Sequence, residues 1–234
     1  MRKLITVSLL LLCLLLCLLL GACAAQAPDA STAATETTAD PAGQLPTVAG
    51  FEPQADWQPV TGQGLSILAA GSYSGRYFED GSDEAVEQVA ALLVKNTGET
   101  TVEYAEITAG SSSFVLSGLP AGATVLVQEA ARGTDPVVDA VVSTCVPAAS
   151  LVEQYDTDFE VYLGDGVINI RNVSGRSFAH DVSVYYKNVE NGVLLGGITY
   201  RARFSGIESG AIGQSIQSHA TEAQSAVVYL SYAD

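Results

Sequence analysis

Residues 159–170 read FEVYLGDGVINI, and this stretch indicates the fold more clearly than any other part of the chain. Apolar side chains alternate with other residues on both sides of a Gly-Asp-Gly turn at 164–166 (Phe159, Val161 and Leu163 before it, Ile168 and Ile170 after it). Alternation of this kind across a glycine-bearing turn is typical of a β-hairpin with one buried and one solvated face.

The sequence beyond this hairpin continues the pattern. Residues 182–186 and 198–204 alternate apolar and polar side chains around an Asn-Gly turn at 191–192, and residues 227–232 supply a last apolar run. Antiparallel sheets that are buried on one face show this period of two. The second half of the chain therefore predicts an antiparallel β-sandwich.

The first half also predicts strands, although less clearly. Residues 90–95, 125–127 and 137–146 are short runs rich in aliphatic and β-branched side chains. Helical periodicity is scarce, and residues 82–86 are the one place where a short helix could begin.

The two halves resemble each other. Residues 92–98 (LLVKNTG) parallel residues 168–175 (INIRNVSG), and residues 117–123 (SGLPAGA) parallel residues 205–211 (SGIESGA). Self-similarity of this kind suggests a duplicated module. We therefore expect an all-β chain with two tandem immunoglobulin-like antiparallel β-sandwich domains.

The first 23 residues predict export. A cationic head (residues 1–3) precedes an uncharged, leucine-rich run (residues 4–20), and Gly21 and Ala22 then lead to Cys23. This order is typical of a secretory signal peptide. An uncleaved transmembrane anchor is the alternative, since the apolar run approaches the length that spans a hydrocarbon core of ~30 Å. In both cases the positive head stays inside and residues from 24 onward lie outside.

Residues 20–23 resemble the lipobox of bacterial lipoproteins. The resemblance implies cleavage after Ala22, so that residues 1–22 are the signal peptide, and attachment of lipid such as palmitate at Cys23. A lipid at this position would anchor the protein to the extracytoplasmic face of the bacterial cell membrane.

Residues 23–60 predict a flexible linker. Ala, Thr, Pro and acidic residues dominate it, and Phe51 and Trp57 are its aromatic residues, so it offers little apolar surface to bury. Both can pack at the edge of the first domain. We expect the first sandwich at residues 61–150 and the second at residues 151–234.

The charge of the chain excludes some classes of partner. The formal net charge is −16, and removal of residues 1–22 takes away two basic residues and no acid, which lowers it to −18. A surface of this sign is unsuited to nucleic acid or to anionic lipid. Once the leader is cleaved and Cys23 acylated, Cys145 is the last free thiol, so no internal disulfide is expected.

The second half also resembles a known family. A strand ending in Asn-x-Ser-Gly at residues 172–175, an alternating strand, a hairpin and an Ile-x-x-Gly turn at residues 207–210 resemble the FxLYD-type immunoglobulin-like modules of Gram-positive lipoproteins. The resemblance covers residues 165–234 and, more loosely, 88–130. It implies a non-catalytic β-sandwich, which is an analogy of fold and not of function.

Residues suited to catalysis are few. His180 and His219 have no cysteine or second histidine nearby, so we expect no metal site, no cofactor and no enzyme activity. Cys145 lies in an apolar run and is expected to pack in a core. The acidic run at residues 79–84 lacks the spacing of a calcium loop and is expected to be a solvated loop.

Arg201 and Arg203 are the candidate contact residues for an anionic partner. Alternation places them with Thr199 on the outward face of one strand. Cross-strand pairing with local acids is the alternative interpretation.

These observations predict a membrane-anchored, extracytoplasmic lipoprotein that acts as a non-catalytic binding or structural module of the cell envelope. Its expected partners are the lipid membrane, through acylated Cys23, and an envelope protein or polymer, with no nucleic acid. An accessory subunit of a membrane transport or envelope complex is the alternative, and an enzyme is a third.

Overall fold

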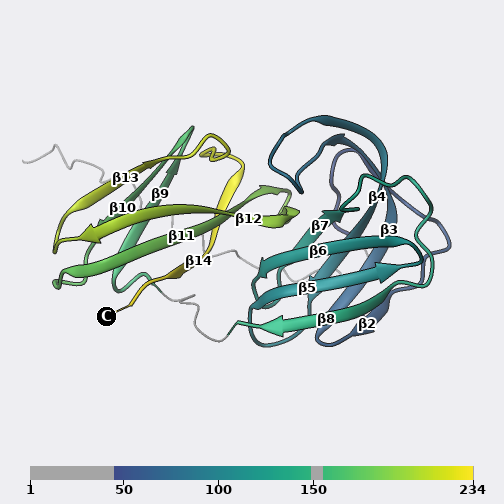
Figure 1. Cartoon of the computed structure of the whole chain (residues 1–234), viewed down its shortest axis with the longest axis horizontal. Helices are drawn as coiled ribbons and strands as arrows, with labels where there is room; N and C mark the ends of the chain where they lie inside the picture. Colours follow the sequence, from purple (N-terminus) through teal and green to yellow (C-terminus); the bar gives the residue numbers. More distant parts are fainter. Residues whose placement is uncertain (1–44, 149–154, 234) are drawn as a thin grey trace, which may run out of the picture. The chain divides into compact units, whose positions relative to one another are not determined.

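The computed structural model describes residues 45–148 and 155–233, and all regular secondary structure in these ranges is β-strand (Figure 1). The predicted all-β fold is therefore confirmed. The strands are β1 (Phe51–Pro53), β2 (Val60–Gly62), β3 (Leu65–Arg76), β4 (Ala85–Asn96), β5 (Val102–Ala109), β6 (Ser112–Leu119), β7 (Thr124–Gln128), β8 (Val141–Pro147), β9 (Phe159–Gly164), β10 (Val167–Asn172), β11 (Phe178–Glu190), β12 (Val193–Ile207), β13 (Ile212–Ile216) and β14 (Ser225–Ser231).

The described strands form one large sheet and two small ones. The large sheet has eight strands in the order β1-β3-β4-β7-β12-β11-β14, with β2 also paired to β3. The small sheets have the orders β6-β5-β8 and β13-β10-β9. This arrangement is of the β-sandwich type, with a small sheet covering each part of the large one.

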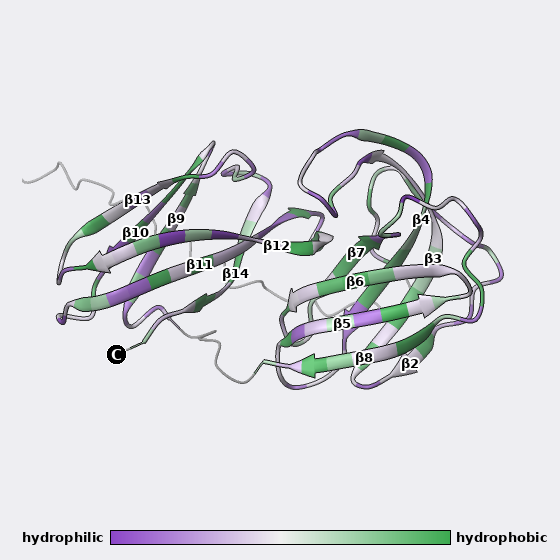
Figure 2. Cartoon of the chain, in the orientation of Figure 1, coloured by the Kyte–Doolittle hydropathy of each residue, from purple (hydrophilic) through white to green (hydrophobic). Residues whose placement is uncertain are grey.

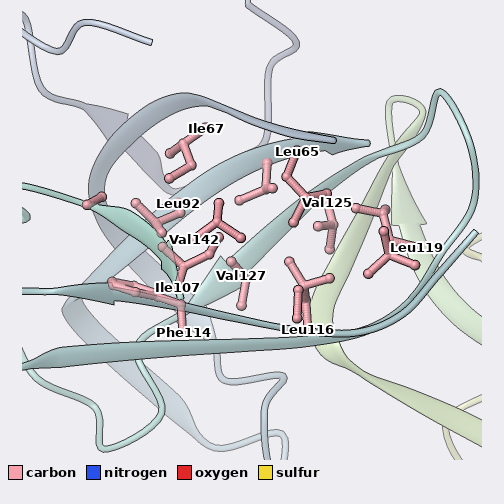
Figure 3. Close-up of a cluster of buried hydrophobic side chains, with 14 of the residues drawn as sticks. Leu65, Ile67, Leu92, Ile107, Phe114, Leu116, Leu119, Val125, Val127 and Val142 are labelled. Carbon is pink, nitrogen blue, oxygen red and sulfur yellow. The ribbon is translucent and has the colours of Figure 1, made fainter. Parts of the chain in front are cut away.

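The first sandwich encloses its core between β6-β5-β8 and strands β3, β4 and β7. Leu65, Ile67, Leu92 and Phe114 are fully buried in this core, and Figure 3 shows them pointing toward one another from the two sheets. Alternation of hydrophobic and hydrophilic segments along the strands is visible in Figure 2. Strands β5 and β6 alternate buried and more exposed residues, as expected for burial on one face. Strands β4 and β7 instead have runs of consecutive buried residues, because Leu93 and Leu126 belong to a second buried cluster beside the first core.

The second sandwich packs β13-β10-β9 on strands β11, β12 and β14. Its buried residues include Phe159, Ile170, Val184 and Phe204. The predicted hairpin at residues 159–170 is confirmed as β9 and β10, which pair antiparallel with Val161 opposite Ile170.

Strand β12 joins the two sandwiches. Its first residues, Val193–Leu195, pair in parallel with Thr124–Leu126 of β7. These and the later residues of β12 also pair antiparallel with β11. Leu194 of β12, with Val228 and Tyr229 of β14, belongs to the core of the first sandwich. Both halves lie in one compact unit of the chain, Thr37–Asp234. Strands from both sides of the boundary predicted near residue 150 thus belong to the same large sheet.

The two blocks of self-similar sequence fold into the same corner. The Asn96 side-chain amide donates to the carbonyl oxygen of Leu119, and its Oδ1 accepts from the N–H of Gly98. The Asn172 amide donates to the carbonyl oxygen of Ile207 in the same way, and its Oδ1 accepts from Ser174. Both asparagines are buried, so these bonds satisfy polar atoms that water cannot reach.

Two local expectations differ from the structure. The fold begins before residue 61, because Val48 is buried and β1 pairs with β3 through Phe51 opposite Tyr73. Residues 82–84 lead into strand β4 and not into a helix, because Ala85 and Val86, which follow them, pair with Arg76 and Gly75 of β3.

Candidate functional site

The outer face of sheet β13-β10-β9 exposes large apolar side chains. Ile212 and Ile216 of β13 are 69% and 77% exposed, and Tyr162 of β9 is 46% exposed. Ile212, Gln214 and Ile216 alternate with less exposed residues along β13, so they lie on one face of the strand. Isoleucine side chains this exposed are candidates for contact with another molecule, since their burial would be favourable.

Polar side chains fill the middle of this outer face. Arg171 of β10 lies between Ile212 and Glu160 in the cross-strand register, and its Nη1 is 3.1 Å from the Glu160 carboxylate. Gln214 donates from Nε2 to Oδ1 of Asn169 at 3.1 Å. These pairs hold the face in one register and leave the isoleucines at its edge uncovered.

Strand β13 is also an open edge. It pairs with β10 on one side, and none of the other described strands pairs with its second side. Its sequence, IGQSI, contains neither a charged residue nor proline, the residues that usually protect an exposed edge. An extended segment of another chain can therefore add to the sheet here.

The predicted arginine face is only partly as expected. Arg201 and Arg203 are both exposed, but Arg203 binds the carboxylate of Asp181, with its Nε at 2.6 Å. This pair also lowers the pKa of Asp181. Thr199 does not point outward, because its Oγ1 donates to the carbonyl oxygen of Ser117 in β6 at 2.9 Å. Local pairing therefore accounts for Arg203, whereas Arg201 takes part in none of the ion pairs found in residues 45–148 and 155–233.

The two histidines have different surroundings. His180 is exposed on β11. His219 stacks on the Tyr200 ring with centroids 4.6 Å apart, and its Nδ1 lies 3.1 Å from Oδ2 of Asp83. Arg76 binds the other oxygen of Asp83 at 2.6 Å. Sequence reasoning missed this cluster, because 136 residues separate Asp83 from His219 and no motif connects them.

Basic and amide groups bind the carboxylates of the acidic run. Arg132 makes ion pairs of 2.6 Å with both Asp80 and Glu84. Hydrogen bonds from Ser82, and then from Arg132, lower the pKa of Asp80 to about 2. Arg132 and Ser82 therefore hold residues 79–84 in one conformation, and we call this segment the tied loop. Among the described residues, no group of side chains is suited to bind a metal ion.

The carboxylate of Glu79, also in the acidic run, lies where the two sandwiches meet. Glu79 accepts hydrogen bonds from the backbone N–H of Gln128 at 2.7 Å and of Gly197 at 2.6 Å. The fully buried Lys187 donates from Nζ to the carbonyl oxygens of residues 196–198 at 2.6–3.0 Å. Burial raises the pKa of Glu79 and lowers the pKa of Lys187, while the attraction between the two charges opposes both changes.

The remaining predicted residues are placed as follows. Cys23 and the cleavage position after Ala22 lie outside the described residues. Cys145 of β8 packs against the first core, and burial raises the pKa of its thiol. None of the described residues belongs to a helix long and apolar enough to span a bilayer.

Comparisons of this chain with protein-family models, curated proteins and solved structures find no match.

Proposed function

We propose that this chain is a bacterial lipoprotein, anchored by acylated Cys23 on the extracytoplasmic face of the membrane, that binds another envelope protein without catalysis. The exposed edge strand β13 carries the binding part of the proposal, because Ile212 and Ile216 flank a backbone edge that pairs with no strand in residues 45–148 or 155–233 other than β10. The leader at residues 1–23 supports the location.

The partner contributes an extended segment in this proposal. Strand addition satisfies the free backbone groups of β13, and apolar side chains of the added strand cover the isoleucines. The main-chain hydrogen bonds of the added strand form whatever its sequence. Its side chains opposite Ile212 and Ile216 determine which partner binds.

The side chains that resemble catalytic groups have structural partners here. His219 is stacked and bound to Asp83, and Glu79 is occupied by backbone N–H groups. These contacts favour a binding role, since general acid–base chemistry needs a group within reach of a substrate.

Fractionation of the intact lipoprotein and a Cys23→Ala variant tests the location. The proposal predicts that the native protein is recovered with membranes and labelled by a palmitate analogue, and that the variant is unlabelled and released from membranes. Release of both forms, or retention of both, contradicts the lipid anchor.

In-cell crosslinking tests the binding role. The native protein is expected to capture a defined envelope protein, and Ile212→Lys together with Ile216→Lys is expected to abolish the capture. Val146→Lys replaces an exposed apolar side chain on β8 and serves as the matched control. Equal capture by all three forms contradicts binding at β13.

A further inference from the structure

We propose that a groove in the first sandwich binds an extended, basic segment of another polypeptide, with a lysine or arginine side chain lying against Trp57. The groove has a volume of about 600 Å³ and lies between residues 54–60, which connect β1 to β2, and residues 137–141, which lead into β8. It lies on other strands than β13, so the two proposals are independent.

The apolar part of the groove is held in place. Trp57 packs against the first core, and its Nε1 donates to the carbonyl oxygen of Ile67 at 3.2 Å, which fixes the indole. Val138 and Val141 on the opposite side are 55% and 58% exposed. The groove thus offers part of a half-buried indole ring and two aliphatic side chains that are more than half exposed.

The polar part of the groove is acidic. Asp56 and Asp139 line it, both are exposed, and neither takes part in the ion pairs found among the described residues. Residues 45–148 contain thirteen acidic and three basic residues, and Arg76 and Arg132 are already bound to acids. The groove therefore attracts a cation.

These features together favour a basic segment over other occupants. A guanidinium or ammonium group on the Trp57 ring gains a cation–π interaction, and the two carboxylates supply charge-assisted hydrogen bonds. The valines then cover apolar side chains on either side of the cation. Residues 24–44 of this chain contain three acids and no lysine or arginine, so charge excludes them as the occupant, and it also disfavours a second copy.

Trp57 is the only tryptophan of the sequence, so its fluorescence reports on the groove directly. The probe is the peptide acetyl-VKVRV-amide, with acetyl-VQVQV-amide and the polyamine spermine as comparisons. We expect saturable quenching or a spectral shift with the basic peptide at concentrations up to about 1 mM, and a Kd at least about tenfold weaker for the neutral peptide.

Asp56→Asn combined with Asp139→Asn is the matched change in the protein. Asparagine suits Asp139 because this residue has a φ of 51°, a conformation that asparagine tolerates. We expect this variant to keep its circular dichroism and to bind the basic peptide about tenfold more weakly. Asp165→Asn combined with Glu222→Gln removes the same charge elsewhere and should leave the Kd unchanged.

The proposal is overturned by no fluorescence change with the basic peptide, by equal binding of the neutral peptide, or by an unchanged Kd in the Asp56 and Asp139 variant. Binding of spermine as tight as that of the basic peptide would also overturn it, because the groove would then be a site for small polyamines.

Discussion

The side chains of Glu79 and Lys187 both bind the backbone of Gly197. The Glu79 carboxylate accepts from the N–H of Gly197 at 2.6 Å, and the Lys187 ammonium donates to the carbonyl oxygen of Gly197 at 3.0 Å. Gly197 belongs to β12, the strand that both sandwiches share. The two charges thus fix β12 at the point where it passes from one core to the other, and this contact can be tested.

Replacement of Lys187 by methionine should destabilise the fold by about 3 kcal/mol or more, because three carbonyl oxygens lose their donor and Glu79 loses the opposing charge. Urea unfolding measures the loss. Lys95→Met, at a half-buried lysine of β4, is the control and should cost less than about 1 kcal/mol. Equal stability of the two variants would show that Lys187 is not needed at the junction.

Replacement of Gly197 by alanine should separate β12 from β6. A Cβ at this position would overlap the backbone oxygen of Val115 and lie 2.8 Å from the Glu79 carboxylate. We expect a loss of roughly 3 kcal/mol, the upper range for forced overpacking. Gly62→Ala is the control, since its Cβ would meet Val142 at an ordinary 3.7 Å. A Gly197→Ala protein as stable as this control would refute the close approach.

The two buried asparagines should be equivalent in energy. Asn96→Ala and Asn172→Ala each leave buried backbone groups without a partner, and we expect each to cost about 2–3 kcal/mol. Asn169→Ala, in the same strand as Asn172 but half-buried, should cost less than about 1 kcal/mol. A large cost at one buried asparagine and none at the other would argue against two equivalent corners.

The lowered pKa of Asp80 predicts how the stability of the fold changes at acidic pH. Hydrogen bonds from Ser82 and Arg132 lower this pKa from 3.8 to about 2, so the folded state binds the proton less tightly than the unfolded state. The resulting stabilisation is present above pH 3.8 and is lost as the pH falls toward 2. Carboxyl NMR should show a midpoint near 2, and Ser82→Ala should raise it. A midpoint near 3.8 in the native protein would mean that the tied loop is not formed in solution.

Local patterns in the sequence predicted much of this fold. The hairpin at residues 159–170 needs no distant information, because alternation and a turn define it within twelve residues. Self-similarity predicted a duplicated module, and the structure adds that Asn96 and Asn172 make matching side-chain hydrogen bonds in its two copies. The parallel pairing of Val193–Leu195 with β7 was not predicted. The two segments lie far apart in the sequence, and no local pattern specifies that they become neighbours in the sheet.

The surfaces were harder to predict than the cores. Alternation put Thr199 on the outward face with Arg201, yet at Thr199 that face meets β6 of the other sandwich. In residues 212–216 both isoleucines share one face, but nothing local tells whether a second sheet covers it. Exposure of Ile212 and Ile216 therefore became visible only in three dimensions.

The most direct test of binding at β13 is photo-crosslinking from that strand in intact cells. A photoreactive amino acid replaces Ile212, Gln214 or Ile216 in the native lipoprotein, and Val146 on β8 in the control. Strand addition at β13 predicts that the three β13 positions yield one and the same protein adduct, and that Val146 does not. Adducts that differ among the three positions, or that also form from Val146, would contradict it.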